Sequence, residues 1–144
     1  MSDAKKIIKC FKKGGKVLVC GNGGSATMAS HLVGEFMGKF EHERQPLPAI
    51  SLFDLATITA IANDYSYEDI FARQIEALGN EGDILITLST SGGSKNVLNA
   101  ISVAESKGLV VIQAPIDSLA TAYAQEDQLK WLHRVVRKVE KAFI

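Results

Sequence analysis

The 144-residue chain is poor in cysteine, proline and tryptophan, carries no net charge and lacks long apolar runs. It holds two cysteines, three prolines and one tryptophan, and its 16 Lys and Arg balance 16 Asp and Glu for a formal net charge of zero. No apolar run reaches the roughly 18 residues of a membrane-spanning helix. These shortages argue against a disulfide scaffold, a zinc knuckle and a nucleic-acid-binding surface. We expect one domain over residues 1–144, without a nucleic-acid or membrane partner.

The amino-terminal segment and the cysteines both favour a cytoplasmic protein. Residues 1–15 are basic but lack the apolar core of a secretory signal. Cys10 and Cys20 are isolated, with no second cysteine at metal-ligand spacing. We therefore expect two reduced thiols that pack as small side chains.

The stretch from 16 to 40 joins a short apolar run, a glycine loop and a helical pattern. We expect a strand at 16–20, a loop at 21–25 and a helix over about 26–40, with Ser25 as its N-cap. Glycines let the backbone approach a ligand closely, and a helix start offers free N–H groups and the positive end of the helix dipole. The stretch therefore predicts a site for a negatively charged group.

The rest of the chain alternates between strand and helix patterns. The expected elements are helix 3–13, strand 49–52, helices 54–63 and 67–78, strand 83–88, helix 95–107, strand 109–112 and helix 121–143. This alternation predicts an α/β fold, a three-layer sandwich with a central parallel sheet and right-handed crossovers. Ligands of such sheets bind beyond the carboxyl ends of the strands, which is where the loops at 21–25 and 89–94 fall.

The second loop, at 89–94, offers four hydroxyls beside the start of the next helix. They belong to Ser89, Thr90, Ser91 and Ser94. Hydroxyls and backbone amides together can surround a phosphate without a lysine. A solvated Ser/Gly linker is the alternative, and the pairing with a similar loop favours the phosphate site. Neither loop carries a Walker motif or a dinucleotide fingerprint.

Several titratable and amide side chains are candidates for chemistry. His31 and Glu35 lie four residues apart and share one helix face, as metal ligands, an acid/base pair or surface residues. His133 follows Gln125 by eight residues, about two helical turns. All four side chains converge if the last helix crosses the first loop. Asn63 and Asp64 form a turn that could contribute to the same site.

Five segments together resemble a known family. They are GNGGSA at 21–26 followed by His31 and Glu35, LPAISL at 47–52, TAIANDYSYEDIFARQIEALGNEGD at 59–83, STSGGS at 89–94 and a patch at 124–133. They resemble the phosphoheptose isomerases, which are sedoheptulose 7-phosphate isomerases of the sugar-isomerase (SIS) domain superfamily. The likeness runs nearly unbroken from 15 to 108.

The resemblance implies a fold, a reaction and a set of residue roles. It implies a flavodoxin-like SIS domain in a homotetramer with sites between subunits. The reaction is the aldose–ketose isomerisation of sedoheptulose 7-phosphate to D-glycero-D-manno-heptose 7-phosphate through an enediol, towards bacterial lipopolysaccharide. It implies Glu35 and His133 as the catalytic pair, and a Zn²⁺ in each subunit held by His31, Glu35, Gln125 and His133. The implied substrate-binding residues are Asn22, Gly23, Gly24, Ser25, Glu35, Asn63, Asp64, Ser89, Thr90, Ser91, Ser94 and Gln125.

The chain also departs from the family pattern. Lys39 stands where arginine is usual, and Gln128 replaces a frequent histidine. About twenty residues fewer than usual separate the strand at 109–112 from Pro115. Either the chain is a compact variant of the family, or 109–113 joins pieces of two family strands, and the likeness of 113–115 to the end of the family's last strand favours the second. The alternative functions are a non-catalytic SIS module that associates with the replication initiator DnaA, and a sugar-phosphate-sensing regulator. The presence of both Glu35 and His133 argues against the first, and the lack of a DNA-binding segment against the second.

Overall fold

The computed structural model describes residues 1–116 and 120–144, and a four-stranded sheet lies at its centre. The strands are β1 (Val17–Gly21), β2 (Ala49–Ser51), β3 (Ile84–Leu88) and β4 (Val110–Gln113). They lie in the order β2-β1-β3-β4, and every neighbouring pair is parallel. The predicted α/β fold with a central parallel sheet is confirmed, and its strand order is that of a flavodoxin-like sheet.

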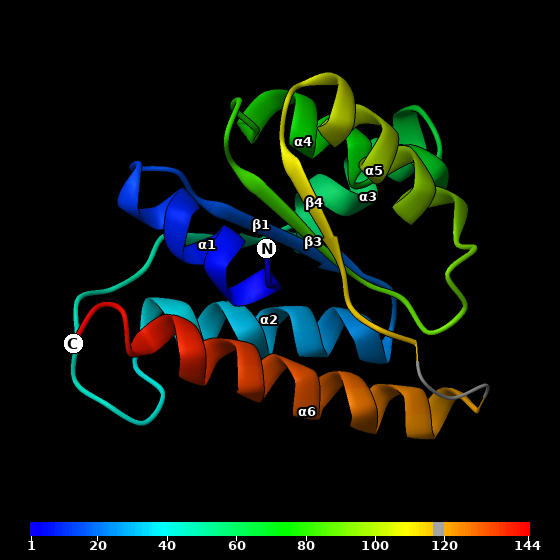
Figure 1. Ribbon diagram of the computed structural model, residues 1–144. Coiled ribbons are helices and arrows are strands. Elements are labelled where there is room, and N and C mark those ends of the chain that lie inside the picture. Colours follow the sequence, from blue (N-terminus) through cyan, green and yellow to red (C-terminus); the bar gives the residue numbers. More distant parts are fainter. Residues whose placement is uncertain (117–119) are drawn as a thin grey trace.

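Helices cover both faces of the sheet (Figure 1). One face carries α1 (Asp3–Lys12), α2 (Gly24–Met37) and α6 (Thr121–Glu140). The other carries α3 (Leu55–Asp64), the 3-10 turn η1 (Tyr67–Asp69), α4 (Ala72–Leu78) and α5 (Lys95–Ser106). None of the helices in the described part of the chain is long and apolar enough to cross a membrane.

Side-chain alternation along the strands builds two cores. Val17 and Val19 of β1 point into the core under α1, α2 and α6, whereas Leu18 and Cys20 point into the core under α4 and α5. Every residue of β1 and β3 is buried, as expected for central parallel strands. Burial raises the pKa of the Cys20 thiol to about 12, so this cysteine stays protonated and unreactive.

Two local predictions differ from the structure. Residues 67–78 form the turn η1 and then α4, because the Ser66 side chain accepts a hydrogen bond from the Glu68 N–H and starts a tight turn there. Ser25 is not an N-cap. Gly23 occupies that position with φ +55°, and Ser25 lies buried inside the first turn of α2. A glycine tolerates this backbone conformation, which explains the earlier start of the helix.

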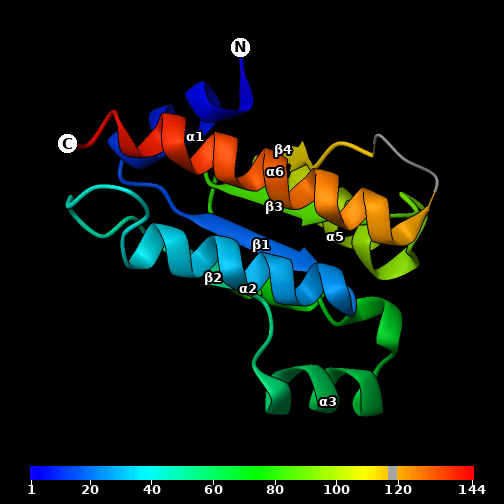
Figure 2. The same ribbon diagram turned by 90° about the horizontal axis from the view of Figure 1, so that it is seen from below.

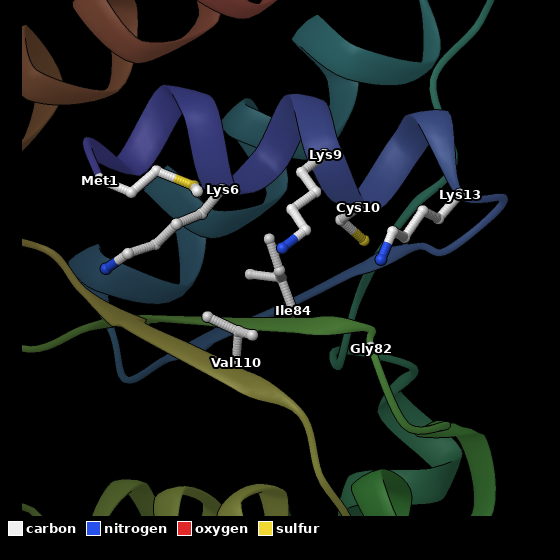
Figure 3. A pocket seen from close by; sticks show the side chains of 8 residues that line it. All are labelled: Met1, Lys6, Lys9, Cys10, Lys13, Gly82, Ile84 and Val110. Atoms are coloured by element: carbon white, nitrogen blue, oxygen red, sulfur yellow. The ribbon is translucent and has the colours of Figure 1, made fainter.

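Within the run 109–113, Val110–Gln113 forms one strand that pairs with β3 in continuous register. Because β4 is an edge strand, Val110 is 41% exposed. A groove of about 390 Å³ lies beside it, with Lys6 and Lys9 of α1 and Lys13 just after α1 above Ile84 and Val110 (Figure 3). This groove lies at the amino ends of β3 and β4, away from the edge where both polar loops emerge.

The start of the sheet is held by a buried ion pair. The Asp83 carboxylate accepts hydrogen bonds from the Lys16 ammonium at 2.6 Å, the Lys16 N–H at 3.0 Å and the Asn80 N–H at 2.9 Å. Burial alone would raise the pKa of Asp83, but the hydrogen bonds from Lys16 and Asn80 and the charge of Lys16 outweigh it and lower the pKa. The pair therefore stabilises the folded state while Asp83 is ionised.

Replacing Asp83 should reveal this contribution. We expect Asp83→Asn to lower the free energy of unfolding by about 2 kcal/mol at pH 7, because the Lys16 charge loses its partner. A carboxylate with a lowered folded pKa stabilises above its unfolded pKa of about 3.9 and loses that effect as pH falls through the folded pKa. The gap between the two proteins in urea unfolding should therefore shrink below pH 4.

The exposed pair of Asp3 and Lys6, 3.7 Å apart, supplies the control. Asp3→Asn should change the free energy of unfolding by less than about 0.5 kcal/mol. An Asp83→Asn effect that stays constant between pH 7 and pH 3 would contradict the assignment.

Candidate functional site

Helices α2 and α6 lie side by side and run in the same direction (Figures 1 and 2). Each follows a strand of the parallel sheet and packs back along the same face, so both helices run opposite to the strands and in the same direction. His31 of α2 therefore meets His133 of α6, and the segment after α2 meets the carboxyl end of α6. This parallel contact brings residues about 100 positions apart into one site.

Three titratable side chains meet across the helix pair. His31 Nε2 lies 3.0 Å from Glu35 Oε1 and 3.2 Å from His133 Nε2. The Phe40 ring stacks on His133 with centroids 5.4 Å apart. The His31 side chain is 43% exposed and that of Glu35 is 20% exposed, so the cluster opens to solvent or to another molecule. The arrangement can hold a proton between groups or bind a cation.

The cluster has the dimensions of a zinc site. One ligand atom from each of His31, Glu35 and His133 lies within 4.8 Å of the others. Ligands at 2.0–2.2 Å from a tetrahedral zinc are separated from one another by about 3.3 Å, close to the two distances above. Two imidazole nitrogens and one carboxylate oxygen are also donors that zinc prefers. The residues present therefore fit the metal.

Gln125 lies beside the amino-terminal end of α2, away from the His31, Glu35 and His133 cluster. A Cβ built on Gly24 would stand 2.3 Å from Gln125 Nε2, so the amide lies directly over the first residue of α2. His31 follows Gly24 by seven residues, about 10 Å along a helix. The structure thus brings three of the four side chains of the metal prediction together, and places Gln125 beside the glycine loop.

A small polar cavity lies at the carboxyl ends of β1 and β3. It has a volume of about 50 Å³ and is lined by Asn22, Ser25, Leu88, Ser89, Thr90 and Ser94. At roughly 10–15 Å³ per water on this measure, it holds about four oxygen-sized groups, which is the size of a phosphate. The cavity lies where both loops were predicted to meet.

The helix starts at this cavity lack side-chain caps. Gly23 before α2 and Ser94 before α5 make no side-chain capping bond, whereas Ser2, Asp54 and Ser66 cap α1, α3 and η1. The N–H groups that open α5 are therefore available to an anion. At the start of α2 the Ser25 and Ala26 N–H groups already donate to the Asn22 and Gly23 carbonyls, so this helix start offers less. The loop between β3 and α5 is shaped by its own bonds, since Ser89 accepts from the Gly92 N–H and Ser91 from the Gly93 N–H.

Asn96 and Tyr67 contribute to this region, although the sequence analysis did not identify either residue. Asn96 and Asn22 exchange amide hydrogen bonds of 2.8 and 2.9 Å, and Tyr67 donates to Asn22 at 3.1 Å. Asn96 is 3% exposed and holds Asn22 at the mouth of the cavity. A polar residue in the first turn after the second loop is the only sequence sign of this role.

The remaining predicted residues lie further out. Asn63 and Asp64 are exposed at the end of α3, where Asn63 donates to Asp64 at 3.2 Å. Lys39 pairs with Glu43 at 2.6 Å on the surface. Gln128 is fully buried and donates to the Ser89 carbonyl at 3.0 Å, so it supports the second loop from behind.

Comparison with known proteins agrees with this geometry. The sequence model of the SIS domain family matches residues 2–114. A phosphoheptose isomerase of Thermodesulfovibrio yellowstonii is 57% identical over 107 residues, which are 74% of this chain and 53% of that protein. The chain thus spans about half the length of this relative. A phosphoheptose isomerase of Campylobacter concisus is 42% identical over 154 residues, covering 95% of this chain and 82% of that protein.

Solved structures give the same result. A phosphoheptose isomerase from Francisella tularensis superposes with a TM-score of 0.92 at 39% identity, over 96% of this chain and 83% of that one. One from Neisseria gonorrhoeae has a TM-score of 0.87 at 31% identity over the same shares. The chain therefore belongs to the phosphoheptose isomerase family of SIS domain proteins.

Proposed function

We propose that the protein isomerises sedoheptulose 7-phosphate to D-glycero-D-manno-heptose 7-phosphate. The observation that carries the proposal is the meeting of His31, Glu35 and His133 at 3.0 and 3.2 Å in a chain of this family. An aldose–ketose isomerisation needs a base and a proton donor on adjacent carbon and oxygen atoms, and no external oxidant. The product feeds heptose synthesis for bacterial lipopolysaccharide, in the cytoplasm.

The phosphate binds in the cavity between the two loops. Hydroxyls of Ser89, Thr90, Ser91 and Ser94 and the free N–H groups of α5 surround it, while Asn22, Gly23, Gly24 and Ser25 line the sugar. Asn63, Asp64 and Gln125 complete the substrate site. Binding the phosphate far from the reacting carbons orients C1 and C2 at the acid/base pair.

Glu35 and His133 transfer the protons. One of them removes a proton from C1 of the ketose, and the electron pair forms the C1–C2 double bond of an enediol. The oxygen on C2 takes up a proton and the hydroxyl on C1 loses one. Return of a proton to C2 then yields the aldose, so hydrogen has moved from C1 to C2 with no net change in oxidation. A carboxylate and an imidazole both do this near neutral pH.

In this proposal His31, Glu35 and His133 would hold a zinc ion in each subunit, and Gln125, which lies beside Gly24 in this structure, would be the fourth ligand that the family resemblance implies. The fit of three of these side chains to zinc distances supports it. When bound, the metal polarises the carbonyl and the hydroxyl oxygens of the substrate. Besides supplying ligands, His31 orients Glu35 through the 3.0 Å contact.

The site is completed in a homotetramer, between subunits. Helix α3 supports this, because none of its ten residues is buried and Leu55 is 75% exposed. Figure 2 shows α3 set apart from the sheet. Ile58, Ile61 and Ala62 of α3 pack against the core only partly, so the helix retains apolar surface that a further molecule can cover. A second copy of the chain covers that surface and closes the open side of the cluster.

Removing either catalytic group should abolish most turnover. We expect Glu35→Gln and His133→Ala to lower kcat for sedoheptulose 7-phosphate by at least ~100-fold, as for loss of a general acid or base. Glu43→Gln, an exposed carboxylate outside the cluster, should keep wild-type kcat. A wild-type rate no higher than that of Glu35→Gln would favour a non-catalytic binding module.

Zinc binding should be visible as a gain in stability. At a free Zn²⁺ concentration 100 times Kd, the free energy of unfolding should rise by about 2.7 kcal/mol, because only the folded chain offers the site. His31→Ala should lose this gain, and His42→Ala, in the exposed loop after α2, should keep it. Equal stabilisation of the wild type and His31→Ala would place the zinc elsewhere.

Disrupting α3 should separate the subunits. Analytical ultracentrifugation should give about 62 kDa for the wild type, four times the 15.5 kDa of one chain. Leu55→Asp should sediment as a smaller species with much lower activity, whereas Val110→Thr, at another exposed apolar position, should remain tetrameric. A wild-type protein that sediments at 15.5 kDa would refute the tetramer.

A further inference from the structure

A carboxylate is buried where a helix dipole disfavours it. Glu140 is the last residue of α6 and is 1% exposed. Negative charge at a helix carboxyl end is opposed by the dipole, and burial adds a desolvation penalty. Three backbone N–H groups compensate, since Phe40 donates to Oε2 at 3.0 Å and Glu41 and His42 both donate to Oε1. Glu140 therefore ties the segment after α2 to the end of α6.

Arg44 provides the matching positive charge and holds α2. Its side chain is fully buried, and Nη2 lies 3.3 Å from Glu140 Oε2. The same guanidinium donates to the carbonyl oxygens of Glu35, Phe36 and Gly38, at the carboxyl end of α2. The Phe36 carbonyl also accepts from the Leu47 N–H, whereas the arginine satisfies the Glu35 carbonyl, which has no partner within α2.

This pair joins both halves of the cluster. Arg44 bonds the main chain of Glu35 itself, and Glu140 lies on the helix that carries His133. Glu140 also fixes Phe40, whose ring stacks on His133. A second, exposed ion pair between Glu41 and Arg137 links the same two segments, but its hydrogen bonds do not reach α2.

We propose that Arg44 and Glu140 are positioning residues, which set the distance between the Glu35 and His133 side chains by clamping the end of α2 to the end of α6. The proposal rests on the function proposed above for the cluster. Because neither residue lines the phosphate cavity, the clamp governs the proton transfer and the metal, and leaves phosphate binding unchanged.

Arg44→Lys is the sharpest test, because lysine keeps the charge opposite Glu140 but lacks the planar five-donor fork that reaches Glu140 and the α2 carbonyls together. We expect kcat for sedoheptulose 7-phosphate to fall ~10- to ~100-fold with KM within about 2-fold. Zn²⁺ affinity should fall by a similar factor, as for other groups that orient metal ligands. Glu140→Asp, which shortens the carboxylate, is the second variant and should act in the same direction.

A third measurement depends on neither turnover nor metal. The His31 and His133 ring centroids lie 5.3 Å apart, close enough for a nuclear Overhauser effect between their imidazole protons. The wild type should show this effect in the metal-free protein, and Arg44→Lys should weaken it. If the wild type shows it but does not turn over sedoheptulose 7-phosphate, the proposed reaction fails, and the imidazole signal still decides the clamp.

Two controls separate positioning from stability. Glu41→Gln breaks the exposed pair and should leave kcat, Zn²⁺ affinity and the imidazole signal unchanged. Val139→Ala removes buried apolar contacts beside Glu140 and should lower the unfolding temperature without changing kcat at 25 °C. The proposal is overturned if Arg44→Lys matches the wild type in all three readouts, if the wild type lacks the imidazole signal, or if Val139→Ala loses as much kcat.

Discussion

The parallel packing of α2 against α6 is the contact on which the site depends, because neither helix alone brings two imidazoles within hydrogen-bond distance. Both helices pack back along one face of the sheet after a parallel strand, so they run in the same direction. Each then presents its side chains at matching heights, so that Gly24 meets Gln125, His31 meets His133 and Phe40 meets Glu140. The fold thus places residues about one hundred positions apart in the sequence in contact at three successive points along the helix pair.

The ion pairs of this protein differ in burial, and therefore in how much they contribute to the stability of the fold. The Lys39–Glu43 and Glu41–Arg137 pairs are exposed, and such pairs contribute little to stability. Asp83 and Glu140, by contrast, are almost wholly buried, and each accepts hydrogen bonds from backbone N–H groups and forms an ion pair with a cationic side chain. A buried charge without these partners would be strongly destabilising, so both residues specify one backbone arrangement around them.

The strands, the sheet and the two polar loops could be predicted from local pattern. In a chain that alternates strands and helices, an apolar run followed by glycine and serine indicates a buried strand that ends in a loop. The contact of His31 with Glu35 is also local, at one helical turn. Predicting that His133 joins them needed the family resemblance, since no local pattern gives the pairing of α2 with α6. The roles of Asn96 and Arg44 escaped prediction because each depends on partners that only the tertiary fold supplies. Ser25 was assigned to the wrong place because the +55° φ of Gly23 starts the helix earlier than a serine cap would.

The uncapped starts of α2 and α5 carry a consequence for how the protein behaves in ordinary solutions. Backbone amides at a helix start recognise charge and shape, and they do not discriminate among tetrahedral oxyanions of similar size. In the proposed phosphate site, inorganic phosphate and sulfate would therefore compete with a sugar ester for the same cavity, and buffers containing them would raise the apparent KM. Large organic anions, which the 50 Å³ cavity excludes, would not compete.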